Sequence, residues 1–198
     1  MPRGRIPVIT NLAGHLLVSP PGGTSRHIVY VCEHADADHT AFGLRLDNPV
    51  PELDFSQVLL QQEIITPEES LILPDETKRI PVLHGGDNDG RRGFILHSSD
   101  VFLPDQTQKI SEMISLTRTP DLLRAIGRRS GPRRVLLAIG SRAWSPGAVT
   151  KEIFEGNWLV CPGEPEIVFG ANPEEQYAMA LAHLGLNAAT RISAPGFA

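Results

Sequence analysis

One stretch of the chain constrains the fold most, because it joins an apolar run to a glycine, a serine and a proline within residues 133–147. The continuous apolar run at 136–139 is typical of a strand covered on both faces. Gly140 predicts the end of that strand, because glycine adopts backbone angles that other residues resist. Ser145 then predicts a helix N-cap, and Pro146 fits the first helical position. The stretch therefore predicts a buried strand, a tight turn and the start of a helix.

A strand–turn–helix junction of this kind is a candidate ligand site, because free backbone N–H groups converge there and favour an anion. Arg142 is placed to pair with a phosphate or carboxylate, and Trp144 to cover an apolar part of the ligand. We favour the structural alternative, in which Trp144 only anchors the turn against the core, because helix starts are common and bound anions are not. The candidate residues of the turn are Gly140, Ser141, Arg142, Trp144, Ser145 and Gly147.

The composition excludes several classes of protein. The 198 residues, 41% hydrophobic and 21% charged, suit one globular core. The net charge of −5 disfavours a dedicated nucleic-acid binder, whose binding face is basic. No run reaches the roughly 18 apolar residues of a membrane span. Three arginine pairs, at 91–92, 128–129 and 133–134, are read as solvated charge, with a local phosphate or carboxylate patch as the alternative.

The two cysteines, Cys32 and Cys161, form no Cys-x-x-Cys pair. Because no clear export signal is seen among the first 21 residues, we expect free thiols and a cytoplasmic location. Cys32 lies in an apolar run and is expected to be a small buried side chain. The alternative is a thiolate–imidazole pair with His34, which shares its face of a strand at i+2.

Patterning along the chain predicts many short elements. Helices are expected after the caps Asp54, Thr119 and Asn172 and over 146–154, and residues 87–90 are expected to form a polar turn. Strands first cluster and then alternate with helices. This order predicts an α/β or α+β fold, a mixed-sheet sandwich with flanking helices. Besides 136–139, strands are expected at 15–19, 27–33, 41–46, 80–83, 93–97, 110–116 and 158–161.

Two histidines end predicted strands, where side chains of open sheets often meet in pockets. His34 and His97, with Glu33 or Asp100, are candidates for acid–base or metal chemistry. The chain has no His-x-His, no His-x-x-x-His and no cofactor fingerprint, so we expect no metal and no cofactor. Together with Arg92, these two histidines complete the set of candidate ligand-binding residues.

A series of short matches in fixed order runs through almost the whole chain. The matching residues are Leu12, Gly14, Leu17, Ser19 and Pro20, then 29–34, Ala41, Gly43, Leu44, Pro49, Gly85, Gly86 and 92–98, followed by Gly140, Trp144, Pro146, Gly147, Glu152, Trp158, Leu159, Pro162, Ile167, Phe169, Ala180, Leu181, Leu184 and Gly185. In their order and spacing they resemble the AlgH/YqgE family of bacterial proteins, which has no established biochemical activity.

The resemblance implies an α/β sandwich with a small α+β lobe from about residues 52–112, within a single domain over 1–198. The chain departs from the family pattern at several polar positions. The family usually has Asn-Arg-Pro where this chain has Asp47, Asn48 and Pro49, so a positive charge is lost. Changes also follow Gly86 and Gly140, so a ligand site shared by the family is expected to be altered here.

Three functions compete at this stage. A non-catalytic binding or interaction module, with a protein or a small anion as partner, is favoured because no nucleophile, metal or cofactor motif is present. The second is an anionic-metabolite binder or enzyme that uses the 140–147 turn with His34, Arg92 or His97. The third, a transcriptional regulator, is disfavoured, because the helix after Thr119 leads into a predicted strand rather than a second helix.

Overall fold

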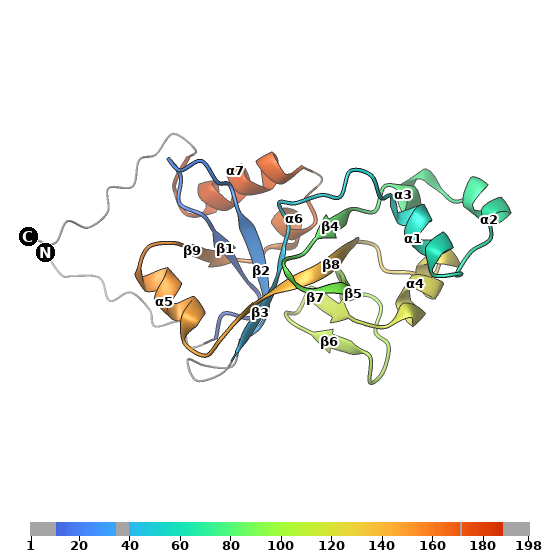
Figure 1. The fold of residues 1–198 in the computed structure, drawn as a ribbon, viewed down its shortest axis with the longest axis horizontal. Helices are drawn as coiled ribbons and strands as arrows, with labels where there is room; N and C mark the ends of the chain where they lie inside the picture. The colour runs from blue at the N-terminus through green and yellow to red at the C-terminus, as the bar shows by residue number, and fades with distance from the viewer. Residues whose placement is uncertain (1–10, 35–39, 171, 188–198) are drawn as a thin grey trace, which may run out of the picture.

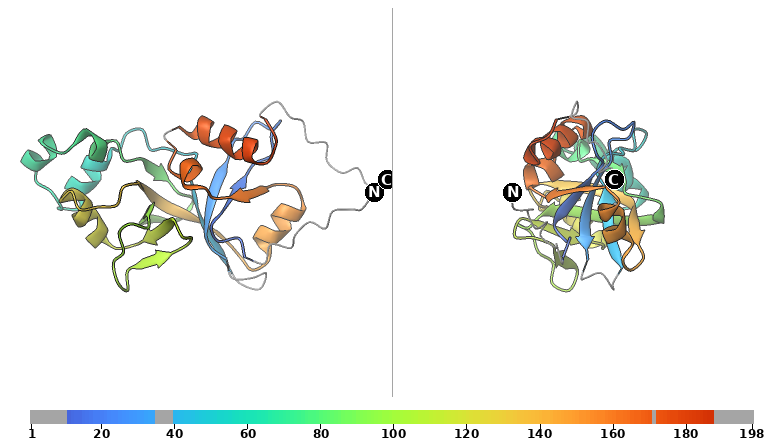
Figure 2. Two further views of the ribbon diagram at one scale, coloured as in Figure 1. Left: turned by 180° about the vertical axis from the view of Figure 1, so that it is seen from behind. Right: turned by 90° about the vertical axis from the view of Figure 1, so that its left-hand side faces the viewer.

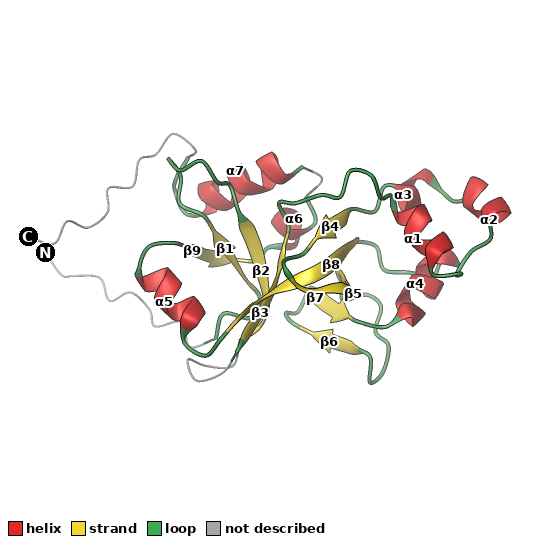
Figure 3. Ribbon diagram, viewed as in Figure 1, coloured by secondary structure: helices red, strands yellow, loops and turns green. Residues whose placement is uncertain are grey.

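The computed structural model describes residues 11–34, 40–170 and 172–187. Within them, nine strands form one curled sheet with helices packed around it, which confirms the predicted α+β class (Figures 1 and 3). The strands are β1 His15–Val18, β2 Ile28–Glu33, β3 Ala41–Arg45, β4 Val82–His84, β5 Asn88–Ser98, β6 Thr107–Lys109, β7 Ile114–Thr117, β8 Val135–Trp144 and β9 Leu159–Pro162. The helices are α1 Phe55–Gln61, α2 Pro67–Leu71, α3 Asp75–Lys78, α4 Pro120–Gly127, α5 Ala148–Phe154, α6 Pro165–Val168 and α7 Pro173–His183.

The strand order is β6-β7-β5-β8-β3-β2-β1-β9, with β4 also beside β8. Neighbouring strands are antiparallel except for β4 and β8, which run parallel, so the sheet is mixed as predicted. The predicted hairpin of β2 and β3 is present, with a register shift between Val31 and Glu33. Helices α1 to α4 gather at one end of the molecule, and α5 and α7 lie toward the other end (Figures 1 and 2).

Strand β8 links the two ends, and it corrects the prediction of a turn at Gly140. The strand continues through Gly140 to Trp144, first beside β4 and then beside β3. Helix α5 begins at Ala148 after the N-cap Gly147, so Ser145 is not the cap and Pro146 is not the first helical residue. The backbone N–H groups of residues 140 and 141 therefore belong to a strand and not to an anion-binding turn.

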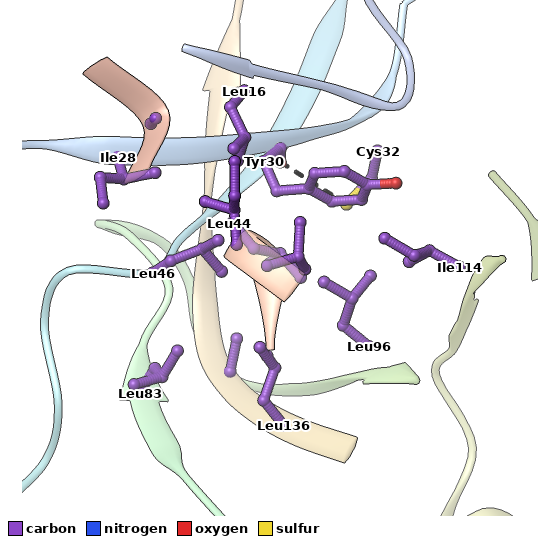
Figure 4. Packing of buried hydrophobic residues seen from close by; sticks show 14 of the residues in the cluster. Leu16, Ile28, Tyr30, Cys32, Leu44, Leu46, Leu83, Leu96, Ile114 and Leu136 are labelled. Carbon is purple, nitrogen blue, oxygen red and sulfur yellow. Dashed lines mark hydrogen bonds between the residues drawn. The ribbon is translucent and has the colours of Figure 1, made fainter. Parts of the chain in front are cut away.

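Alternation along the strands divides the core between the two faces of the sheet. On β1 and β2, Leu16 and Tyr30 enter one cluster, which α6 and α7 cover, whereas Leu17 and Val31 enter another beside α5. Figure 4 shows Leu16, Tyr30 and Cys32 within the first cluster. A third cluster packs helices α1 and α4 against the sheet through residues such as Phe55, Leu122, Ile126, Ile95 and Leu137.

Local signals placed the helix starts well. Asp54 and Asn172 cap α1 and α7 through their side chains, whereas Thr119 occupies the N-cap position of α4 without a side-chain bond to the helix backbone. The expected polar turn at residues 87–90 is wrong, because β5 begins at Asn88 and accommodates the polar residues by a register shift before Gly93.

None of the helices in the described ranges is long and apolar enough to cross a bilayer.

Candidate functional site

A carboxylate binds two indoles and a guanidinium where the end of β8 meets α5. The indole N–H groups of Trp144 and Trp158 donate to Oε2 of Glu152 at 3.1 and 2.7 Å, and Arg142 Nη2 donates to the same oxygen at 3.3 Å. The guanidinium carbon of Arg142 lies 4.9 and 5.3 Å from the centroids of the two indole rings. These four residues are referred to below as the tryptophan cluster.

Simple strand and helix geometry assembles the cluster. Arg142 and Trp144 are two residues apart on β8 and therefore share a face of the sheet. Glu152 comes from α5, whose Val149 packs in the same core cluster as the buried Trp144 and Trp158. The cluster thus couples α5 to the sheet.

The charges of the cluster are compensated but remain accessible. The side chains of Arg142 and Glu152 are 37% and 29% exposed, whereas Trp144 is buried. All three donors converge on Oε2, so Oε1 takes none of these bonds. A guanidinium over indole rings gains about 0.5–2 kcal/mol from the ring quadrupoles. Trp144 is therefore an anchor in the core, as the structural interpretation predicts, while Arg142 and Glu152 face outward.

An open cleft of about 960 Å³ lies beside the cluster. Arg142, Glu152 and Trp158 line one side, the β1–β2 loop at residues 19–25 lines the other, and His27 contributes where that loop enters β2. This space is referred to below as the tryptophan cleft. It is the surface on which one predicted candidate residue, Arg142, meets residues that were not predicted.

A buried carboxylate stands next to the cleft residue His27. Asp47 Oδ2 lies 3.0 Å from His27 Nδ1 and 2.5 Å from Arg45 Nη2, and its Oδ1 accepts the N–H of Ile28 at 3.1 Å. Burial by itself raises the pKa of Asp47, but the hydrogen bonds from Arg45, His27 and Ile28 outweigh it and hold that pKa below its ordinary value. Asp47 is therefore ionised, and its hydrogen bonds connect β2 to the end of β3.

The other residues of the predicted turn do not reach the cleft lining. Gly140 and Ser141 are buried in β8, and Ser145 is exposed ahead of α5. Gly147 caps α5 in the left-handed conformation, with φ of 75°. Of the predicted turn, Arg142 alone lines the tryptophan cleft.

The predicted pairing of His34 with His97 is not formed. His97 lies opposite Val135 at the start of β8, whereas His34 follows the end of β2, beside the part of β3 that pairs with the end of β8. His34 Nδ1 accepts the backbone N–H of Leu12 at 3.1 Å. Arg92 lies exposed on β5, within its register shift.

His97 belongs to a buried hydrogen-bond chain. Its Nδ1–H donates to the carbonyl of Ser98 at 2.8 Å, which leaves Nε2 to accept the Thr117 hydroxyl at 3.0 Å. Thr117 Oγ1 lies 2.8 Å from Thr107 Oγ1, which accepts the N–H of Leu103. Burial lowers the pKa of His97, so the ring is held neutral.

The cysteines do not provide a reactive thiol. Cys32 and Cys161 are free and buried, and the Cys32 thiol lies 3.7 Å from the carbonyl oxygen of Tyr30 (Figure 4). Burial raises the pKa of Cys32 and that of Cys161, the latter to about 11. The thiolate–imidazole alternative for Cys32 and His34 therefore has no support. Among the described residues, no group of three or more His, Cys, Asp or Glu side chains is arranged to hold a metal ion.

Comparison with known proteins places the chain in a family. A family model described as AlgH-like matches residues 18–189. The chain belongs to the AlgH-like family. A UPF0301 protein of Bradyrhizobium sp. strain BTAi1 is 38% identical over 94% of this chain and 88% of its own length. One from Rhodopseudomonas palustris strain BisB18 is 39% identical over 88% of this chain and 83% of its own.

Solved structures confirm the fold. The solution structure of the AlgH protein from Pseudomonas aeruginosa covers 98% of this chain and 100% of its own, with 28% identity and a TM-score of 0.72. A crystal structure of a protein from Corynebacterium diphtheriae, 18% identical, covers 91% of this chain and 88% of its own, with a TM-score of 0.62, and shows the shared fold alone. The AlgH-like family membership leaves the biochemical activity open.

Proposed function

We propose that this AlgH-like protein is a non-catalytic interaction module that binds an extended polypeptide segment of a partner protein in the tryptophan cleft. One observation carries the proposal: Arg142 and Glu152 lie side by side on the cleft wall, and each keeps hydrogen-bonding capacity for a ligand. Nη2 of the guanidinium makes the bond to Glu152, and the other donors of that group do not take part in it. Oε1 of Glu152 is outside the three bonds that Oε2 accepts.

A donor beside an acceptor matches a peptide group better than it matches an anion. A peptide unit presents a carbonyl, which accepts from Arg142, and an N–H, which donates to Oε1 of Glu152. A small anion that pairs with Arg142 is repelled by the neighbouring carboxylate of Glu152. This juxtaposition supports an interaction module over an anionic-metabolite binder in this cleft.

The lining of the cleft includes residue types that are common at protein interfaces. An arginine and a tryptophan, Arg142 and Trp158, both line it. Aromatic side chains and arginine are enriched at interfaces, where they supply most of the binding energy. A tryptophan whose ring centroid lies 5.3 Å from the Arg142 guanidinium carbon supports a protein ligand.

The placement of the reactive side chains supports a non-catalytic role. Cys32 and Cys161 are buried thiols with raised pKa values, and His97 is held neutral inside the protein. Two free thiols also fit a reducing compartment, so a cytoplasmic location is part of the proposal.

The chain offers its own reporter, because it contains two tryptophans and both indole N–H groups donate to Glu152. Peptides are selected from a displayed random library on the full chain and then titrated into ¹⁵N-labelled protein. We expect selected peptides to shift the Trp158 indole signal and to lose about tenfold or more in affinity in the Arg142→Lys variant.

The matched control is Lys151→Ala, a cationic residue of α5 whose side chain is 76% exposed and which is absent from the cleft lining. It should leave peptide affinity unchanged. A library that yields no binding peptide, or peptides that bind Arg142→Lys as tightly as the unmodified chain, would overturn the proposal.

A further inference from the structure

We propose a second binding site, apart from the tryptophan cleft, for a small organic molecule that carries two or more phosphate groups. The site is a groove of about 780 Å³ between the end of α3, the segment 128–134 that joins α4 to β8, and α6. Four arginines line it: Arg79, Arg129, Arg133 and Arg134. It is referred to below as the arginine groove, and it contains the pair Arg133 and Arg134 and one member of the pair 128–129, for which the sequence left a phosphate patch open.

Two of the four arginines in the groove, Arg79 and Arg129, form no ion pair with a described residue, and a third is paired only at a distance. Arg129 Nη2 donates to the backbone carbonyl of Ile72 at 3.1 Å, which neutralises no charge. Arg133 has a 90% exposed side chain, with Nε 3.9 Å from a carboxylate oxygen of Asp100. Arg79 is exposed and forms no ion pair within the described part of the chain.

Three carboxylates oppose this charge without cancelling it. Arg134 Nη1 pairs with Glu166 Oε1 at 3.1 Å, and Glu76 also lines the groove. Four guanidinium groups against Glu76, Glu166 and the Asp100 carboxylate beside Arg133 leave the groove positive by one charge, on a chain whose net charge is −5. A positive groove on a negative protein concentrates anionic ligands.

Arg129 stands where the backbone favours glycine. Helix α4 ends in a Schellman motif, in which Arg129 N–H donates to Ile126 O at 3.0 Å and Ser130 N–H to Ala125 O at 2.9 Å. Arg129 adopts φ of 61°, in the left-handed region. A side chain there costs about 1 kcal/mol relative to glycine. The chain therefore holds a guanidinium in the groove at the expense of local stability.

The rest of the lining indicates the ligand class. Guanidinium groups bind phosphate oxygens through paired N–H donors, so several of them suit more than one phosphate. Apolar side chains, among them Ile80, Pro132 and Phe169, line the same groove and suit an organic body such as a nucleoside. The groove volume is that of a small-molecule site, and the net charge disfavours a nucleic acid.

The test measures binding of inorganic pyrophosphate and of adenosine diphosphate to the full chain at fixed ionic strength, by calorimetry and by the rise in Tm. Adenosine is the uncharged comparison. We expect both phosphate probes to bind and to raise Tm, the diphosphate nucleotide more tightly than pyrophosphate, and adenosine to have no effect.

Variants locate the site. Arg133→Gln with Arg134→Gln should weaken both phosphate probes by about tenfold or more. The control, Arg91→Gln with Arg124→Gln, removes the same charge from exposed arginines outside the groove lining and should bind normally. Arg129→Gly should weaken binding while it preserves or raises Tm, an outcome that general damage to the fold cannot produce.

Failure of pyrophosphate and adenosine diphosphate to bind would overturn the proposal, and so would equal affinities in the two double variants. Binding of pyrophosphate alone, with no gain from the nucleoside, would overturn the assignment of the apolar side chains to an organic body. These results do not bear on the tryptophan cleft, because the two sites share no lining residue.

Discussion

Gly140 and Gly86 approach each other so closely that neither has room for a side chain. A Cβ atom on Gly140 would lie 2.4 Å from the carbonyl oxygen of Gly86, and one on Gly86 would lie 2.3 Å from the carbonyl oxygen of Ser141. The contact stands where β8 exchanges β4 for β3 as its neighbour. Gly140 is thus required by a crossing of two backbones inside the sheet, and not by the end of a strand.

Replacing Gly140 by alanine should therefore be severely destabilising. We expect Gly140→Ala to lower the free energy of unfolding by about 3 kcal/mol or more, because steric overlap adds to the strain of a left-handed residue. The control is Gly156→Ala, since Gly156 has nearly the same φ, 77° against 76°, but nothing within 4 Å of the added Cβ. It should lose about 1 kcal/mol. Urea unfolding decides the matter, and equal losses in the two variants would contradict the crossing.

Elements that depend on residues near them in the chain could be predicted from the sequence, whereas those that depend on distant residues could not. Strands β2 and β3 and helices α4 and α7 lie close to their predicted places, because apolar periodicity and caps such as Asn172 act within a few residues. The continuation of β8 through Gly140 was missed because its cause, Gly86, is more than fifty residues away in the chain. Local turn signals cannot reveal a backbone crossing.

The candidate site was predictable only in part for the same reason. Arg142 and Trp144 stand two residues apart on one strand, and the sequence indicated both. Their acceptor Glu152 and the second indole Trp158 come from other elements. The available signal was that both residues belong to the matches that carry the family resemblance, but a match alone does not show what a side chain contacts.

Glu152 should stabilise the fold as well as line the cleft. We expect Glu152→Gln to lower the free energy of unfolding by about 1–2 kcal/mol, because charge-assisted bonds from Arg142 and two indoles become weaker. Both indole N–H signals should move in the ¹⁵N spectrum. Glu155→Gln, which removes a half-exposed carboxylate from the residue just after α5, should change stability by less than about 0.5 kcal/mol and leave both signals in place. Unmoved indole signals in Glu152→Gln would rule out the shared acceptor.

Asp47 should contribute a pH-dependent part of the stability. Its pKa in the folded protein is lowered, so the stabilisation is complete above the ordinary aspartate pKa of about 3.9 and is lost as the pH falls through the lower folded value. Asp47→Asn, which introduces the residue that the family usually has here, should therefore be less stable at pH 7. The difference should shrink below about pH 4. Urea unfolding from pH 7 to 3 measures it, and a difference that stays constant with pH would refute the ionised state of Asp47.

His97 should make the free energy of unfolding depend on pH just below neutrality. Burial lowers its folded pKa below the ordinary value of about 6.5. The unfolded chain therefore binds a proton that the folded chain does not, and stability is full above that value and falls as the pH drops below it.

The variant His97→Gln should flatten the loss of stability between pH 7 and 5, whereas His183→Gln, at the exposed end of α7, should keep the full pH dependence. Thr117→Val tests the same network without removing the ring. Because it leaves Nε2 of His97 without a donor, it should cost about 1–3 kcal/mol. Ring nitrogen shifts report the protonation state directly, and a His97 that becomes charged near pH 6.5 in the folded protein would contradict the neutral, buried assignment.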